Sequence, residues 1–107
     1  MNLSILSKSV HFFGVQNQKN KAIEELGELI TALAKEHFGG GTDAIIDEIA
    51  DVSIMVAQLA LIFGYERVNS RIDFKIDRLE SMMIAKSIRD PEQVDLEEIL
   101  KKRVSTT

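Results

Sequence analysis

The 107-residue chain contains no cysteine and a single proline, Pro91. Without cysteine there can be no disulfide framework, no thiolate metal site and no thiol nucleophile. The scarcity of proline leaves most of the chain free to form helices. Basic residues are also in the minority, with 13 Lys and Arg against 17 Asp and Glu. The resulting net charge of −4 argues against general nucleic-acid binding, which needs a basic surface.

Long hydrophobic runs are missing as well. Three serines and Lys8 interrupt the apolar residues of the N-terminal segment, which therefore lacks the continuous apolar stretch of a signal peptide. The most apolar segment, 49–63, is too short to span a bilayer and includes Asp51. We therefore expect a soluble, cytoplasmic protein without a membrane partner. At this length we expect one domain over residues 1–107.

The spacing of apolar and turn-forming residues predicts an all-α fold. Five segments carry helical patterns, and short linkers containing glycine or proline separate them. Long helices joined by short linkers usually lie antiparallel, so the sequence predicts an antiparallel bundle of four main helices plus a short C-terminal helix. The expected ranges are about 3–13, 16–37, 42–63, 66–86 and 96–103.

Glycines mark the predicted helix ends. Gly14 follows the first helix and Gly64 follows the third. The triplet 39–41 supplies the loose or left-handed backbone that a helix end and a chain reversal need. Thr42 or Asp43 is expected to cap the start of the third helix.

The second and third helices carry different apolar patterns. On the second, the apolar residues fall on one arc, as in an ordinary amphipathic helix. Between 49 and 63 only three residues are not apolar, so apolar side chains point in every direction. Such a helix must be buried all round, and a chain this short has little material to surround it, so we expect a homo-oligomer, either a dimer or a tetramer. The arc on the second helix comprises Ile23, Leu26, Leu29, Ile30, Leu33 and Ala34.

Acidic charge is concentrated in one stretch. Residues 24–51 hold eight acids and one base, Lys35, for a net charge of −7, whereas the rest of the chain has a net charge of +3. Within the stretch, Glu25 and Glu28 share an i, i+3 spacing with Glu48 and Asp51. Residues at this spacing are neighbours on a helix, so each pair can converge on one point.

Carboxylates that face one another must share protons, stay solvated or bind cations. Oxygen ligands without Cys favour Mg²⁺ or Mn²⁺ over zinc, and neither His has the Glu-x-x-His spacing of di-iron bundles. The alternative is a solvated acidic helix face, which suits Glu24 and Glu28. It suits Glu48 and Asp51 less well, because acids beside an apolar seam are seldom buried without a partner.

These residues resemble the signature of a known family. The segment Glu24-Glu25-Leu26-Gly27-Glu28 is followed, after nineteen residues, by Glu48-Ile49-Ala50-Asp51. This pattern is similar to the Glu-Glu-x-x-Glu and Glu-x-x-Asp motifs of the MazG-like, all-α nucleoside triphosphate pyrophosphohydrolases, over about residues 16–79. The resemblance implies an enzyme that cleaves a nucleoside triphosphate between the α and β phosphates, with Mg²⁺, or Mn²⁺ in its place, as cofactor.

By this resemblance, the metal ligands would be Glu25, Glu28, Glu48 and Asp51. Glu24 would lie close by, in an outer ligand shell or positioning the attacking water. Members of the family are oligomers whose active sites are assembled around a four-helix core that neighbouring subunits help to build. That arrangement agrees with the apolar third helix.

A basic stripe on the predicted fourth helix adds candidates for phosphate binding. Four basic residues between 67 and 78 follow one another at spacings of four, four and three. Lys75 and Arg78 resemble a Lys-x-x-Arg element that similar proteins carry after the Glu-x-x-Asp helix, where it contacts phosphates. Lys21, one turn before Glu25, is a further candidate. The alternative for the stripe is a salt-bridged solvent face.

The chain departs from the family pattern at two positions. Gln58 stands where relatives often have Asn seven residues after the motif Asp, and Asp73 stands where they often have Asn two residues before the Lys. Both differences bear on how the sugar and base are held. Asn17 and Gln18, at the start of the second helix, are candidates for a base contact or for a helix cap.

Two other functions are compatible with the sequence. A non-catalytic helical oligomerisation or partner-binding module explains the apolar third helix and treats the acids as solubilising. A phosphoribosyl-ATP pyrophosphohydrolase of the same superfamily would share the metal motif, because that motif does not specify the base.

Overall fold

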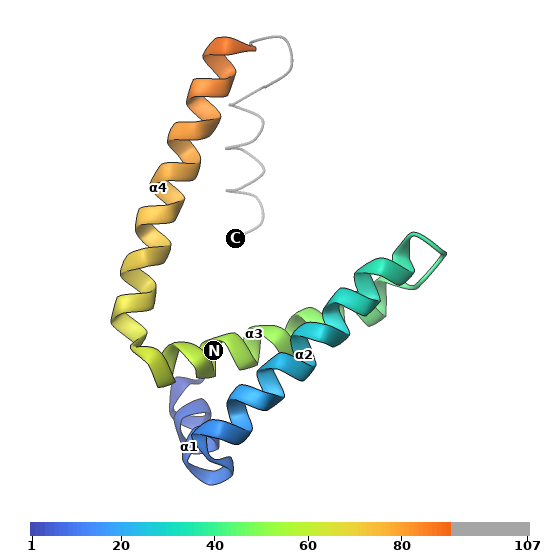
Figure 1. The fold of residues 1–107 in the computed structure, drawn as a ribbon, viewed down its shortest axis with the longest axis vertical. Helices are drawn as coiled ribbons and strands as arrows, with labels where there is room; N and C mark the ends of the chain where they lie inside the picture. The colour runs from blue at the N-terminus through green and yellow to red at the C-terminus, as the bar shows by residue number, and fades with distance from the viewer. Residues whose placement is uncertain (91–107) are drawn as a thin grey trace. The chain divides into compact units, whose positions relative to one another are not determined.

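The computed structural model of the protein describes residues 1–90, which form four α-helices (Figure 1). They are α1 (Leu3–Phe13), α2 (Val15–Glu36), α3 (Thr42–Phe63) and α4 (Tyr65–Arg89). No strand occurs between residues 1 and 90, so the predicted all-α class is confirmed. The helix expected over 96–103 lies outside the described residues.

The chain divides into two compact units, Met1–Val68 and a second that begins at Asn69. In the first unit, α2 runs antiparallel to α3 and packs mainly against it, while α1 contacts both helices (Figure 1). The boundary falls within α4, and the rest of that helix belongs to the second unit. None of the four helices has the length and hydropathy that crossing a membrane requires. The expectation of a single domain stays a prediction.

The ends of α1 follow from local hydrogen bonds. The Asn2 side chain accepts a hydrogen bond from the backbone N–H of Ile5, which satisfies a free donor of the first turn. Gly14 ends the helix with a φ of 93°, a conformation that favours glycine. The Asn17 side chain then donates to the carbonyl of Phe13 at 2.8 Å. This bond satisfies a carbonyl at the end of α1, whereas the cap expected at the start of α2 is not formed, because that end has no side-chain cap hydrogen bond.

The glycine turn between α2 and α3 is a Schellman motif, in which a glycine in the left-handed region closes a helix. The N–H of Gly40 donates to the carbonyl of Lys35 at 2.8 Å, and the N–H of Gly39, at φ 88°, donates to Glu36 at 3.1 Å. Both bonds satisfy carbonyls at the end of the helix. The reversal predicted for the triplet is confirmed, and it fixes the backbone of Lys35.

The cap predicted for α3 was wrong. Thr42 is the first residue of the helix and Asp43 lies in the first turn, while Gly41 occupies the cap position without a side-chain hydrogen bond. The turn is so short that the helical backbone begins directly after the third glycine. Asp43 still places a negative charge at the positive end of the helix dipole, which favours the helix.

The α2–α3 interface of the first unit is narrow and partly polar. On α2 the buried residues are Gln18, Ala22 and Glu25, at positions i, i+4 and i+7. Gln18 Nε2 donates to Gln58 Oε1 at 2.7 Å, so two buried amides satisfy each other across the helix pair. Only five hydrophobic residues of the described chain are buried: Leu6, Ala22, Ile45, Met55 and Ala60.

Most of the apolar arc of α2 stays exposed. Ile23 and Ile30 are 70% and 68% exposed, and Leu26 and Leu33 are also exposed. On α3, exposed apolar residues lie on several sides of the helix, so the burial that its composition requires is not achieved within one chain. These exposed residues on α3 are Ile46, Ile49, Ile54, Val56 and Phe63.

The glycine turn yields a stability prediction. A Cβ added at Gly40 would lie 2.9 Å from the backbone C and O of Lys35, too close for a real contact. We expect Gly40→Ala to lower the free energy of unfolding by about 1–3 kcal/mol, the usual cost of overpacking. Denaturant unfolding followed by circular dichroism would measure it.

Gly41→Ser is the matched control for this prediction. A Cβ at Gly41 meets nothing within 4 Å, and a serine there would supply the missing cap of α3. We expect this variant to be as stable as the wild type or more stable. Equal stability of the Gly40→Ala protein and the wild type would contradict the close approach of Gly40 to Lys35.

Candidate metal centre

Three carboxylates from two helices come together in the first unit. Glu25 of α2 and Glu48 and Asp51 of α3 each offer an oxygen, and these oxygens all lie within 4.8 Å of one another. The i, i+3 spacing puts Glu48 and Asp51 on one face of α3, and the packing of α2 on α3 brings Glu25 to the same place. We call these three residues the acidic triad.

Burial decreases across the acidic triad. Glu25 is only 7% exposed, Glu48 is half-buried and Asp51 is exposed. One oxygen of Glu25 and one of Glu48, the Oε2 atoms, are buried without a hydrogen-bond partner. A buried carboxylate oxygen without a partner is costly, and a bound cation would satisfy it. The donor set is all oxygen, which fits Mg²⁺ or Mn²⁺.

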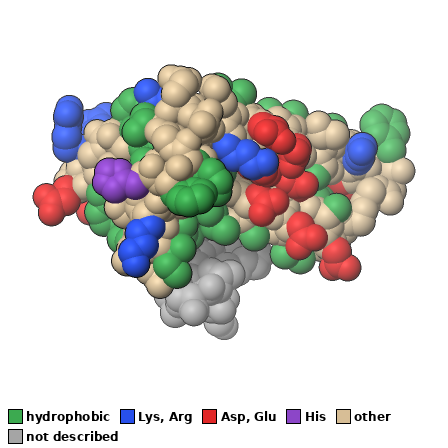
Figure 2. Space-filling view, turned by 90° about the horizontal axis from the view of Figure 1, so that it is seen from below, with side chains coloured by type: hydrophobic (Ala, Val, Ile, Leu, Met, Phe, Trp, Pro, Cys, Tyr) green, Lys and Arg blue, Asp and Glu red, His purple; other side chains and the backbone are tan. Residues whose placement is uncertain are grey.

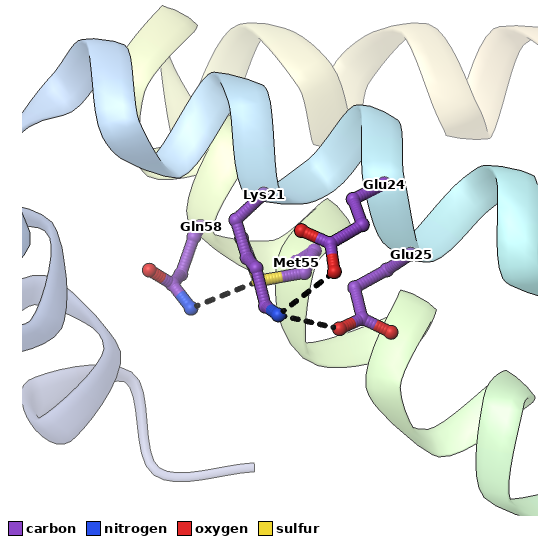
Figure 3. Close-up of polar contacts among 5 residues, drawn as sticks. All are labelled: Lys21, Glu24, Glu25, Met55 and Gln58. Carbon is purple, nitrogen blue, oxygen red and sulfur yellow. Dashed lines mark hydrogen bonds and ion pairs between the residues drawn. The ribbon is translucent and has the colours of Figure 1, made fainter.

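Lys21 supplies the positive charge nearest to the buried carboxylate (Figure 3). Its Nζ lies 3.2 Å from Glu25 Oε1 and 3.5 Å from Glu24 Oε1. The hydrogen bond to Glu25, together with the charges of both acids, raises the pKa of Lys21. Lys21 therefore balances one oxygen of Glu25 and leaves the other oxygen without a partner.

Glu28 lies beside the acidic triad rather than in it. The negative charge of Glu25 is the main cause that raises the pKa of the Glu28 carboxyl, followed by partial loss of water and a hydrogen bond with Glu25. Glu48 and Glu24 add smaller repulsions of the same sign. A carboxyl that resists ionisation among other carboxylates is typical of a site that lacks positive charge.

A cavity of about 590 Å³ adjoins these acids between α2, the glycine turn and α3. Glu28 and Glu48 lie at its acidic end, and Lys35 lies toward the turn. Figure 2 shows acidic side chains gathered on one face of this part of the molecule, with hydrophobic atoms around them. The cavity is lined by Glu24, Gly27, Glu28, Thr31, Ala32, Lys35, Gly40, Gly41, Ala44 and Glu48.

Lys75 and Arg78 lie one turn apart on α4, in the second unit. Together with Leu79 and Met82 they line an open pocket of about 330 Å³. Within the described part of the chain neither residue makes an ion pair within 4.0 Å. The salt-bridged face considered for this stripe is therefore not formed there.

The structure assigns packing roles to Gln18 and Gln58. Gln18 donates to Gln58 and to Ser9 Oγ. Gln58 Nε2 in turn donates to the sulfur of Met55 at 3.6 Å (Figure 3). Gln58 is 3% exposed, so its amide has no free surface for a ligand. Gln58 therefore helps to hold α2 and α3 together.

Sequence reasoning missed the cavity, including Gly27, Thr31 and Ala44 in its wall. One sequence feature could have indicated the cavity. Lys35 is the only basic residue in the stretch 24–51, which holds eight acids. A second was Gly27, a glycine in the middle of a long helix, where it is unfavourable. Neither signal shows which residues of the two helices face each other.

The fold and the site together define a class: an all-α four-helix protein with an acidic group that could hold a divalent cation. Comparison with family models, with curated proteins and with solved structures gave no match. The likeness to the MazG-like enzymes therefore rests on the two sequence motifs alone.

The crowding of carboxylates predicts a pH-dependent stability. Because the folded state raises the pKa of Glu28, it binds that proton more tightly than the unfolded chain does. At pH values below the ordinary pKa of a glutamate, Glu28 therefore favours folding. This contribution to stability is lost as the pH rises through the raised pKa of Glu28 in the folded state. Without divalent cations, we expect Glu28→Gln to melt a few degrees above the wild type at neutral pH, with a gap that narrows toward about pH 4.

Thermal melts in EDTA at several pH values would test this. Glu36→Gln is the control, because Glu36 is exposed and belongs to neither the acidic triad nor the cavity wall. A gap of the same size at every pH, or a lower melting temperature for Glu28→Gln, would show that repulsion does not act on Glu28.

Proposed function

We propose that the protein is a Mg²⁺-dependent nucleoside triphosphate pyrophosphohydrolase. One observation carries the proposal. The acidic triad joins the two halves of the motif across α2 and α3, and two of its buried oxygens have no partner. The resemblance to the MazG-like family connects this arrangement with cleavage of a nucleoside triphosphate.

In the proposed reaction, water attacks the α-phosphorus, the bond from that phosphorus to the bridging oxygen breaks, and pyrophosphate leaves. Glu25, Glu48 and Asp51 would hold the metal. When bound, Mg²⁺ would neutralise phosphate charge and lower the pKa of the attacking water. The chain itself supplies positioning, and no covalent intermediate is needed.

The residues around the acidic triad take supporting roles in this proposal. Glu28 completes the negative surface on the cavity side, and a bound cation would relieve the repulsion that raises its pKa. Glu24, whose side chain is 57% exposed and pairs with Lys21 at 3.5 Å, would orient a water molecule. Lys21 would leave its ion pair with Glu25 and contact the phosphates of the substrate. Lys75 and Arg78, in the second unit, stay candidates for phosphate binding through their resemblance to the Lys-x-x-Arg element.

The exposed apolar residues of α2 and α3 support a homo-oligomer. Large apolar patches on a folded chain mark interaction sites. Ile23, Leu26, Ile30 and Leu33 form one arc, so a second copy that presents the same arc can cover it by two-fold symmetry. We propose that two α2–α3 pairs form a four-helix core, as a dimer or within a tetramer.

The same apolar surface favours a second candidate, a non-catalytic oligomerisation or partner-binding module. That function requires the exposed residues of α2 and α3 and makes no use of the acidic triad. The two candidates differ in their response to Mg²⁺. A cation that binds only the folded state stabilises it, by about 2.7 kcal/mol at a concentration one hundred times the dissociation constant.

The proposed activity predicts the effect of Glu48→Gln. We expect this variant to fold but to lose Mg²⁺-dependent pyrophosphate release. The loss should exceed the roughly 10- to 100-fold cost of removing an outer-shell partner. Wild type and variant would be incubated with a panel of canonical and modified nucleoside triphosphates and Mg²⁺, and pyrophosphate would be measured.

Glu36→Gln again serves as the control and should keep full activity. Near-wild-type release by a folded Glu48→Gln protein would refute its role as a ligand. Absence of release from the wild type with every nucleotide, together with no stabilisation by Mg²⁺, would favour the non-catalytic module.

The proposed oligomer predicts the effect of Ile30→Glu. This change places a charge in the apolar arc, where a second copy would have to bury it. We expect the dissociation constant of the oligomer to rise at least about tenfold, or 1.4 kcal/mol, in sedimentation measurements. Phe38→Glu is the control, because Phe38 lies in the turn and is 91% exposed. Equal masses for wild type and Ile30→Glu would exclude this arc as the interface.

A further inference from the structure

The cavity beside the acidic triad extends well past the carboxylates. Glu28 and Lys35 both line it and lie seven residues apart on α2, so they are separated by about 10 Å along the helix. The acidic end is suited to a metal-bound phosphate, whereas the other end has one cation and no carboxylate among its lining residues. The cavity therefore has two chemically different ends.

Gly27 forms part of the cavity wall at its acidic end, one residue before Glu28. A Cβ added there would meet nothing within 4 Å, so the space beside the helix backbone is empty. Glycine in a helix interior is unfavourable relative to alanine, and no packing contact in the first unit requires it at this position. A ligand that lies against the backbone of α2 would explain why a side chain is missing here.

Lys35 marks the far end of the cavity. The Schellman motif fixes its backbone, through the hydrogen bond from Gly40 to its carbonyl. Its ammonium makes no ion pair within 4.0 Å to any of the described residues. A lysine ammonium carries three donors and no acceptor, so it selects an oxygen or another acceptor on a ligand.

We propose that this cavity holds the nucleoside of the substrate, with the sugar against Gly27 and a carbonyl oxygen of the base at Lys35. This inference rests on the proposed function, because the acidic triad must hold the phosphate end through its metal. Glu48 connects the two parts, since it belongs to the triad and also lines the cavity. Adenine offers ring nitrogens but no carbonyl oxygen to Lys35, so we expect adenine nucleotides to bind more weakly than guanine and pyrimidine nucleotides.

Binding to two kinds of probe tests the proposal. One is a set of nucleoside triphosphates with an uncleavable imido bridge between the α and β phosphates. The other is inorganic triphosphate, which has no nucleoside. Both are titrated calorimetrically in saturating Mg²⁺. Gly27→Leu fills the cavity, and we expect it to weaken nucleotide binding at least about tenfold while inorganic triphosphate changes less than about twofold.

Four further variants extend the test. Gln16→Leu adds the same side chain to α2 at an exposed position outside the cavity, and it should bind both probes like the wild type. Lys35→Met should remove the preference for carbonyl-bearing bases over adenine, and Lys35→Arg should retain it. Gly27→Ala should melt at or above the wild-type temperature, which shows that the position tolerates a side chain in the unliganded protein.

The outcomes separate the two proposals. If the wild type binds neither probe, the proposed function fails and the nucleoside site fails with it. If the wild type binds nucleotides and Gly27→Leu binds them equally well, the function stands and the nucleoside lies elsewhere. Equal weakening of both probes by Gly27→Leu would assign the cavity to phosphates and overturn the proposal.

Discussion

Burial of the Glu25 carboxylate between α2 and α3 is the constraint on which the rest of the site depends. Lys21 pairs with one of its oxygens, the other oxygen is buried without a partner, and Glu48 and Asp51 lie close to the same carboxylate. The repulsion extends to Glu28, whose pKa is raised chiefly by Glu25. Helix packing thus concentrates negative charge that the chain does not balance. A divalent cation at this point would relieve that repulsion and satisfy the buried oxygens.

Two features keep the helix pair in register. At one end, the glycine turn closes α2 through hydrogen bonds to Lys35 and Glu36, and α3 begins two residues after Gly40. Further along the pair, the buried amides of Gln18 and Gln58 join the two helices. Because both connections are specific, the motif acids meet at a defined place and the cavity keeps a fixed wall. The same small residues that allow close approach at the turn leave room for a ligand beside it.

Much of this arrangement was predictable. The four helices follow from the spacing of apolar residues and from the glycines at the helix ends. The i, i+3 spacing placed Glu48 and Asp51 on one face of α3. The predicted apolar arc of α2 is present, but most of it stays exposed, and the residues that α2 buries are Gln18, Ala22 and Glu25. Helical periodicity identifies a face but not its neighbour. For that reason the roles of Gln58 and the cavity wall could not be predicted.

The sequence by itself determined the helical class, the turn at the glycine triplet and the grouping of acids within each helix, since these depend on local spacing and backbone preference. Only the tertiary structure decided which acids meet across the helix pair, that Glu25 is the buried one, and that Gly27 and Lys35 share a cavity with Glu48. Those facts depend on the rotation and register of α2 against α3. Side-chain packing between helices sets both, and no repeat along the chain encodes them.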